Sequence, residues 1–292
     1  MAKAFPKRNY ALRRPVGAKH DEPERRGSKV APDATWAAPT AWEGQAAWYD
    51  QLHGDDGDDF YARLILPSVI ERLRAKRGER ILDLCCGQGV CGRALAALGV
   101  DTVGIDASPT LIAAATARAG KRERYVVGDC RDVAGVLAAE KIFGAFDHAT
   151  LVMALQDLDP IGPVLAGCAA AIKPGGRVVI ALTHPCFRIP RRSSWGWDDE
   201  QGLQYRRMDG YLSPLAAPIK THPGRPADAA HTTSFHRPLS AYLNACGDAG
   251  LAVIGADELC SHRRGTKGPR FGAEDRAAKE FPVFLVIAAV RR

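Results

Sequence analysis

The 292-residue sequence contains no apolar run near the roughly 18 residues that a membrane-spanning helix requires. Residues 1–29 also lack the apolar centre of a signal peptide. The eight cysteines include no CxxC pair and lie mostly inside apolar segments, which is typical of reduced thiols in a protein core. These absences predict a cytoplasmic protein with no membrane segment, no disulfide framework and no metal site.

The net charge of +7 comes almost entirely from the first 29 residues. This leader holds nine Lys or Arg and three Asp or Glu, a balance of +6, so about +1 remains for the rest of the chain. A basic segment without hydrophobic periodicity is typical of a disordered tail and less often of an arm that binds nucleic acid or another partner. We therefore expect a nearly neutral folded part and no nucleic-acid partner.

Strand-like and helix-like segments alternate from about residue 60 onward. Successive units of this kind predict a mostly parallel sheet that is covered by helices on both faces. Glycine and proline punctuate the ends of the helical segments. We expect buried strands near residues 80–85, 101–108, 124–129, 146–155, 177–182, 251–258 and 282–290.

The alternation breaks between residues 184 and 236. This stretch is rich in proline, tryptophan, tyrosine and arginine and shows little helical periodicity. It is far longer than an ordinary connection of about 2–6 residues, so we expect an inserted cap after the fifth strand. The predicted organisation is a leader over residues 1–35, a core over 36–183, the cap over 184–236 and completion of the core sheet over 237–292.

The most informative segment is ILDLCCGQGV, which covers residues 81–90. Its apolar residues predict a buried strand that contains an acid, Asp83, and ends in the turn Gly87-Gln88-Gly89. Glycine lets the backbone turn sharply and approach a ligand, and the helix that follows points its N-terminus at the same place. The turn therefore predicts a site for a nucleotide-like ligand.

Two kinds of cofactor are compatible with this turn. Together with Gly92 it satisfies GxGxxG, and Asp106 lies near the distance expected for a ribose-binding acid, so a nicotinamide or flavin dinucleotide is one hypothesis. Asp83 argues against it, because a carboxylate would repel a pyrophosphate but attract a ligand that carries an ammonium group. A further acid, Asp129, follows the third strand.

Five motifs in order resemble those of class I S-adenosylmethionine-dependent methyltransferases. ILDLCCGQG resembles the first motif, VGIDAS the second, VVGDC the third, FDHATLVMALQD the fourth strand with its end, and AIKPGGRVVI the helix, turn and fifth strand. The resemblance covers residues 36–292. It implies an α/β, Rossmann-like, doubly wound fold with a mostly parallel seven-stranded sheet whose last strand is antiparallel. It also implies an enzyme whose cofactor is S-adenosyl-L-methionine.

The same resemblance implies which residues contact the cofactor. The acid in the first strand and the glycine turn would hold the methionine part, the second acid the ribose, and the third the adenine edge. The end of the fourth strand would face the sulfonium, and an aromatic residue of a leading helix over residues 42–52 would either cover the cofactor or belong to the core. The cofactor contacts expected in this way are Tyr49, Asp83, Cys85, Gly87, Gln88, Gly89, Asp106, Ala107, Asp129, Cys130 and Val152.

The acceptor is expected at the carboxyl ends of the parallel strands, where open α/β sheets bind ligands. His184 begins the cap there, and imidazole titrates near neutral pH, so His184 is either the catalytic base or a histidine that hydrogen-bonds the cap in place. Gln156 and Asp157 follow the fourth strand and face the acceptor or form a surface turn. The arginines of residues 188–192 suit an anionic acceptor or a solvated face. Candidate acceptor contacts are Gln156, Trp195, Trp197 and His236.

These observations predict methyl transfer from S-adenosyl-L-methionine to a small-molecule acceptor. Oxygen or nitrogen is favoured over carbon as the acceptor atom. One alternative is a methyltransferase that acts on RNA or protein, which the basic leader suggests, and another is a non-catalytic protein that retains the cofactor site. The near-neutral core and the aromatic character of the cap favour the small-molecule hypothesis.

Overall fold

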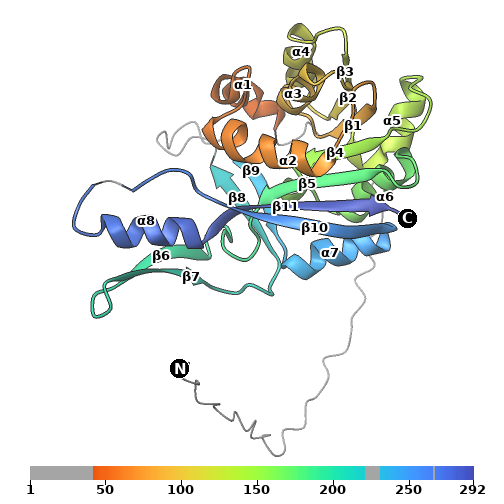
Figure 1. Cartoon of the computed structure of the whole chain (residues 1–292). Helices are drawn as coiled ribbons and strands as arrows, with labels where there is room; N and C mark the ends of the chain where they lie inside the picture. Colours follow the sequence, from red (N-terminus) through yellow and green to blue (C-terminus); the bar gives the residue numbers. More distant parts are fainter. Residues whose placement is uncertain (1–41, 221–230, 266) are drawn as a thin grey trace, which may run out of the picture. The chain divides into compact units, whose positions relative to one another are not determined.

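The computed structural model describes residues 42–220, 231–265 and 267–292 (Figure 1). A seven-stranded sheet in the order β10-β11-β5-β4-β1-β2-β3 forms its centre. β1 to β5 are parallel, and β11 runs antiparallel between β5 and β10. The predicted fold class and the antiparallel last strand are confirmed. The strands of this sheet are β1 (Arg80–Leu84), β2 (Asp101–Asp106), β3 (Glu123–Val127), β4 (His148–Val152), β5 (Arg177–Thr183), β10 (Leu251–Cys260) and β11 (Pro282–Arg291).

Helices cover both faces of the sheet, as Figure 1 shows. α2 and α3 pack with one apolar cluster, and α5, α6 and α7 contribute to another across the sheet, while α4 lies against β2 and β3. No helix in the described part of the chain is long and apolar enough to cross a membrane. The helices are α1 (Ala46–His53), α2 (Leu66–Leu73), α3 (Val90–Ala97), α4 (Pro109–Ala117), α5 (Val133–Ala139), α6 (Gly162–Ala171), α7 (Leu239–Asp248) and α8 (Phe271–Glu280).

The alternation of side chains along β1 determines where its acid lies. Successive residues of a strand point to opposite faces, so Asp83 shares a face with Ile81, which packs in the cluster of α2 and α3. Leu82 and Leu84 belong to the cluster on the other face. Asp83 is paired in register with Thr150 of β4. The one acid of this strand is therefore buried beside α3, close to the end of β1 where the glycine turn begins.

After β5 the chain leaves the central sheet and forms two antiparallel hairpins. The first joins β6 (Ser193–Asp198) to β7 (Leu203–Met208), and the second joins β8 (Leu215–Lys220) to β9 (His231–His236). The segment predicted as a cap thus contains strands that its sequence pattern does not indicate. Its division from the core as a separate domain stays a prediction, and the leader at residues 1–35 and the cap residues 221–230 lie outside the described residues.

α8 is a second element that hydrophobic periodicity does not predict. Only Ala277 of its ten residues is buried, so the helix lacks an apolar stripe. It packs against β7 of the first hairpin and against β10. Its Ala, Glu, Arg and Lys residues are strong helix formers, and their run just before Pro282 is the signal that indicates a helix.

Candidate functional site

β1 ends in a turn with little room for side chains. Gly87 and Gly89 have φ values of +54° and +86°, in the left-handed region that favours glycine. A Cβ built on Gly87 would lie 3.4 Å from Cε1 of Tyr49, and one on Gly89 would lie 2.6 Å from the hydroxyl of Tyr125. The turn is therefore enclosed by two tyrosine rings, and glycine is required for its tight path.

Replacing Gly89 by Ala is expected to lower the free energy of unfolding by about 2–4 kcal/mol, because the methyl group overlaps Tyr125 and the backbone is strained. Chemical denaturation measures the change. Gly247→Ala is the matched control, since that helical glycine has nothing within 4 Å of an added Cβ. The free energy of unfolding of this variant should be unchanged or slightly higher. An unchanged midpoint for Gly89→Ala would contradict the close contact with Tyr125.

Asp83 has one carboxylate oxygen without a hydrogen-bond partner. Thr150 donates its hydroxyl to Oδ1 at 2.7 Å, while Oδ2 is buried and has no partner among the described residues. Burial raises the pKa of Asp83 to about 7; the Thr150 hydrogen bond opposes the shift and the charge of Asp106 adds to it. A cationic group beside Oδ2 would stabilise the charged carboxylate.

Asp106 ties the end of β2 to the glycine turn. Its two carboxylate oxygens accept the backbone N–H groups of Gly87 and Ser108, each at 2.9 Å. Burial raises the pKa of Asp106, while these backbone hydrogen bonds and one from Ala107 lower it. Two carboxyl groups with raised pKa values thus lie at one turn, which suits a ligand with positive charge better than one with a pyrophosphate.

The third predicted acid, Asp129, is paired with a neighbour that no sequence motif indicates. Asp129, after β3, forms an ion pair with Arg131 at 2.6 Å. Burial alone would raise the pKa of Asp129, but the hydrogen bonds from Arg131 hold it below its ordinary value. The thiol of Cys130 accepts the N–H of Cys85 at 3.1 Å, so these predicted residues lie together beneath the turn.

Tyr49 of α1 lies over Gly87, where the sequence predicts a cofactor contact. Its ring packs edge-on against Trp42 at 5.4 Å and lies 4.2 Å from the His53 ring. Burial raises the pKa of Tyr49, and the charges of Asp106 and Asp157 raise it further. The tyrosine is therefore close to both the glycine turn and the acid that follows β4.

The Gln88 side chain holds the segment after α1 in place. Nε2 donates to the carbonyl of Gly54, and Oε1 accepts from Arg93 at 2.8 Å. The side chain is 1% exposed. Both ends of the Gln88 side chain are therefore bonded within the protein, and the cofactor contact at this residue stays a prediction for its backbone.

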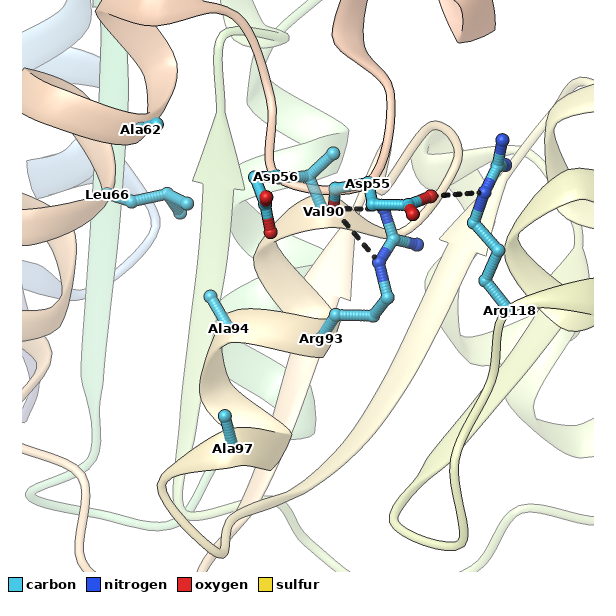
Figure 2. A pocket seen from close by; sticks show the side chains of 9 residues that line it. All are labelled: Asp55, Asp56, Ala62, Leu66, Val90, Arg93, Ala94, Ala97 and Arg118. Carbon is cyan, nitrogen blue, oxygen red and sulfur yellow. Dashed lines mark hydrogen bonds and ion pairs between the residues drawn. The ribbon is translucent and has the colours of Figure 1, made fainter.

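Further polar contacts fix α1 and the acidic turn at residues 55–59. Arg118, which caps the C-terminus of α4, pairs with Asp50 at 2.7 Å and with Asp55 at 2.9 Å, and Asp59 accepts from His262 at 2.7 Å. Figure 2 shows Arg93 and Arg118 on either side of Asp55, beside a cavity of about 630 Å³ along α3. None of the predicted cofactor residues lines this cavity.

The end of β4 places a buried amide and a partly buried acid side by side in a short 3₁₀ turn (Leu155–Asp157). Gln156 donates to the carbonyl of Met153 at 2.7 Å, and its Oε1 is buried without a partner among the described residues. Burial raises the pKa of Asp157 to about 7, against hydrogen bonds from Ser234 and Gln156 that lower it. β9 lies beside this turn, and its inward-pointing Ser234 is 4% exposed. Asp157 is therefore partly buried beside β9, and a role toward the acceptor stays a prediction.

His184 uses both ring nitrogens inside the protein. Nε2 lies 2.8 Å from Oε1 of Glu258, and Nδ1 accepts the N–H of Cys186 at 3.2 Å. Since Nδ1 is an acceptor, the proton is assigned to Nε2, which donates to Glu258. Burial lowers the pKa of His184, although Glu258 opposes that shift. Neither nitrogen is left to take a proton from an acceptor, so the geometry favours the alternative in which His184 holds the cap.

The other candidate acceptor contacts do not converge on one space. Trp195 lines a cavity of about 280 Å³ near the start of β11. Trp197 instead packs under the guanidinium of Arg270 at 4.4 Å, and His236 Nε2 donates to the carbonyl of Tyr211 at 2.8 Å. Neither residue lines that cavity. Within the described residues, no group of three or more His, Cys, Asp or Glu is arranged to hold a metal ion.

Val152 and Cys85 complete the set of predicted cofactor contacts. Val152 ends β4 and is buried in the cluster that packs against α2 and α3. Cys85 begins the turn with φ +53°, an uncommon value for a residue other than glycine. The predicted cofactor residues therefore gather at the ends of β1, β2, β3 and β4, together with Tyr49 of α1.

The chain is similar in sequence to known methyltransferases. A family model described as a methyltransferase domain matches residues 82–178. A demethylmenaquinone methyltransferase of Beutenbergia cavernae is 31% identical over 55% of this chain and 60% of its own length. A ubiquinone biosynthesis O-methyltransferase of Pseudomonas aeruginosa is 32% identical over 46% of this chain and 68% of its own length.

A similar fold occurs among solved structures. An S-adenosylmethionine-dependent methyltransferase from Mesorhizobium loti has 26% sequence identity and a TM-score of 0.58. The match covers 77% of this chain and 96% of that protein. The likeness therefore extends well beyond the residues that the family model matches.

Proposed function

Because the chain belongs to the class I S-adenosylmethionine-dependent methyltransferases, we propose that this enzyme methylates a hydroxyl group of a small molecule. The observation that carries the choice of hydroxyl is the carboxyl of Asp157 in the turn after β4, beside β9, whose pKa of about 7 suits a base. A hydroxyl acceptor must lose its proton, and a base works best when its pKa lies near the working pH. The Pseudomonas relative, whose name specifies O-methyl transfer, supports the same choice.

The residues at the glycine turn fit S-adenosyl-L-methionine. The unpartnered Oδ2 of Asp83 is a suitable partner for the amino group of the methionine part, and Asp106 at the end of β2 is suited to the ribose hydroxyls. Gly87 leaves the space below the Tyr49 ring free of a side chain. The bound cofactor supplies an already activated methyl group, so this chain mainly binds, orients and excludes water.

Asp157 takes the proton of the acceptor hydroxyl in this proposal. Gln156 Nε2 donates to its Oδ2 at 3.5 Å, and β9 packs beside the turn that carries this partly buried carboxyl. The free Oε1 of Gln156 offers a second acceptor for a hydroxyl or amino group of the substrate. The charge of Asp157 also raises the pKa of Tyr49, so the proposed base lies near the tyrosine that covers the glycine turn.

The proposal is tested by calorimetry and by transfer of a labelled methyl group. We expect S-adenosyl-L-methionine and its demethylated product to bind, and label to appear on phenols or alcohols from a panel that also contains amines and activated carbon acids. Failure of both cofactor forms to bind would overturn the cofactor assignment. Transfer to amines or carbon alone would overturn the choice of hydroxyl. The cytoplasmic location stays a prediction.

His184 is proposed to position the cap rather than to act as the base. His184→Ala should keep kcat within about threefold but lower the free energy of unfolding by about 1–3 kcal/mol, since the N–H of Cys186 loses its acceptor. Glu258→Gln is the matched control; it weakens the same contact from a side chain that is 61% exposed and should cost less. If His184→Ala instead slowed turnover by about two orders of magnitude or more with unchanged stability, His184 would be restored as the base.

A further inference from the structure

The cavity lined by Trp195 combines aromatic walls with two guanidinium groups. Its volume of about 280 Å³ is near the lower end of the roughly 300–1,000 Å³ typical of small-molecule sites. The Phe281 ring packs edge-on against both Trp195 at 5.5 Å and Phe187 at 5.8 Å. Its aromatic and charged lining residues are Phe60, Phe187, Arg188, Trp195, Arg206 and Phe281.

The two arginines share this space without a carboxylate. Arg188 lies over the Phe284 ring at 5.3 Å, and Arg206 lies over Trp195 at 4.9 Å while its Nε donates to the carbonyl of Phe187 at 2.9 Å. Arg188 is exposed and Arg206 half-buried, yet partial desolvation lowers the pKa of both arginines, and the charge of Arg206 lowers that of Arg188 further. No acid among the described residues forms an ion pair with either one. An anion between them would relieve their repulsion and accept their hydrogen bonds.

Only one arginine of the run at residues 188–192 faces this cavity. Arg191 donates to the carbonyl of Pro218 at 2.9 Å, and Arg192 donates to that of Ser213 at 3.3 Å. Those two side chains hold the hairpins together. Arg188 has no comparable partner within the described chain and is exposed, so its guanidinium is accessible to a ligand.

The cavity lies beside the carboxyl end of β5, at the same end of the sheet as the proposed reaction site. The Val283 carbonyl at its wall accepts the N–H of His184, and Phe284 is in register with Thr183 at the end of β5. β11 is two strands away from β4, which corresponds to about 10 Å across the sheet. The start of β11, which borders the cavity, is therefore about two strand spacings from the end of β4.

We propose that this cavity binds the anionic end of the methyl acceptor, a carboxylate or phosphate carried on an aromatic ring. The inference rests on the proposed function and names its substrate class. The guanidinium groups hold the anion, and the aromatic walls of Trp195 and Phe281 pack against the ring. The hydroxyl at the other end of the acceptor is then directed toward Asp157.

Calorimetry with the full chain tests the site, with benzoate, phenyl phosphate and uncharged benzamide as probes of similar shape. We expect at least one anion to bind about tenfold or more tightly than benzamide, and the preferred anion distinguishes a carboxylate from a phosphate site. Affinity should fall as salt is added. Equal binding of the anions and benzamide, or no binding of any probe, would overturn the proposal.

Arg188→Gln should weaken anion binding about tenfold or more and leave benzamide unaffected. Arg207→Gln is the matched control, because Arg207 is next to Arg206 on β7 and pairs with Asp209 instead of lining the cavity. Arg206→Gln should repeat the loss, and Arg206→Lys should recover part of it, which separates charge from the contact that holds Phe187. Unchanged anion binding in Arg188→Gln with an intact fold would refute the site.

The same titrations separate this inference from the proposed function. Binding of the demethylated cofactor is measured in wild type and in Arg188→Gln, and we expect no difference. Anion binding without any cofactor binding would leave the cavity assignment standing and remove the proposed function. Cofactor binding with methyl transfer to neutral phenols alone would leave the proposed function standing and remove the cavity assignment.

Discussion

Asp83→Asn is expected to weaken the binding of S-adenosyl-L-methionine by about 100-fold or more, while it stabilises the ligand-free protein. The carboxylate is buried, and one of its oxygens lacks a partner. If that oxygen pairs with the amino group of the cofactor, removal of the charge leaves a cation unpaired in a buried site, which costs about 3–5 kcal/mol. Calorimetry measures the loss directly.

The opposite effect on stability follows from the raised pKa of Asp83. Its pKa is near 3.8 when unperturbed and about 7 in the folded chain. Between these values the folded state binds more protons than the unfolded state, so this group lowers stability as the pH rises from about 4 to 7. Above pH 7 the full penalty is present, and a neutral asparagine removes about 2 kcal/mol or more of it.

Denaturation of the ligand-free protein at pH 5 and pH 8 checks the sign. The stability difference between Asp83→Asn and wild type should grow with pH. Asp101→Asn is the control, because that acid at the start of β2 is half exposed and pairs with Arg122 at the surface. An Asp83→Asn protein with native cofactor affinity would show that another group holds the amino end of the cofactor.

The acid in β1 was predictable because the information lies within ten residues. Alternation along the strand and the glycine spacing are local properties, so the positions of Asp83, Gly87 and Asp106 follow from the sequence alone. Because neighbouring parallel strands end at the same side of a sheet, the acids at the ends of β1 and β2 are expected to lie close together. The cofactor side of the site is thus largely encoded in short-range pattern.

The acceptor side depends on contacts between distant parts of the chain. His184 is a plausible base until Glu258, 74 residues later, occupies its Nε2. Asp157 resembles a surface turn until β9 packs beside it, about 77 residues further along. Arg188 and Arg206 meet only because the first hairpin brings the second arginine back to the start of the cap. Pairings of this kind have no local signature, so charge and periodicity alone do not identify them.

Asp157→Asn is expected to lower kcat for a hydroxyl acceptor by about 10²- to 10⁴-fold, the usual contribution of a general base. Cofactor affinity should stay within about threefold of wild type, since the glycine turn is untouched. Because the pKa of Asp157 is about 7, wild-type kcat/KM should rise with pH up to that value and then level off. The variant should lose this rising limb.

A purely structural Asp157 would behave differently in the same measurements. The folded-state pKa of Asp157 is raised, so Asp157→Asn should stabilise the protein above pH 7 or leave its stability unchanged. A loss of activity in this variant would therefore not come from a folding defect. Asp159→Asn is the matched control, because that carboxyl pairs with Arg237 and is 58% exposed; it should keep both the rate and the pH limb. Retention of the limb in Asp157→Asn would assign the proton to another group. Its loss, with cofactor affinity and stability preserved, would identify Asp157 as the base, because only the proton transfer depends on that charge.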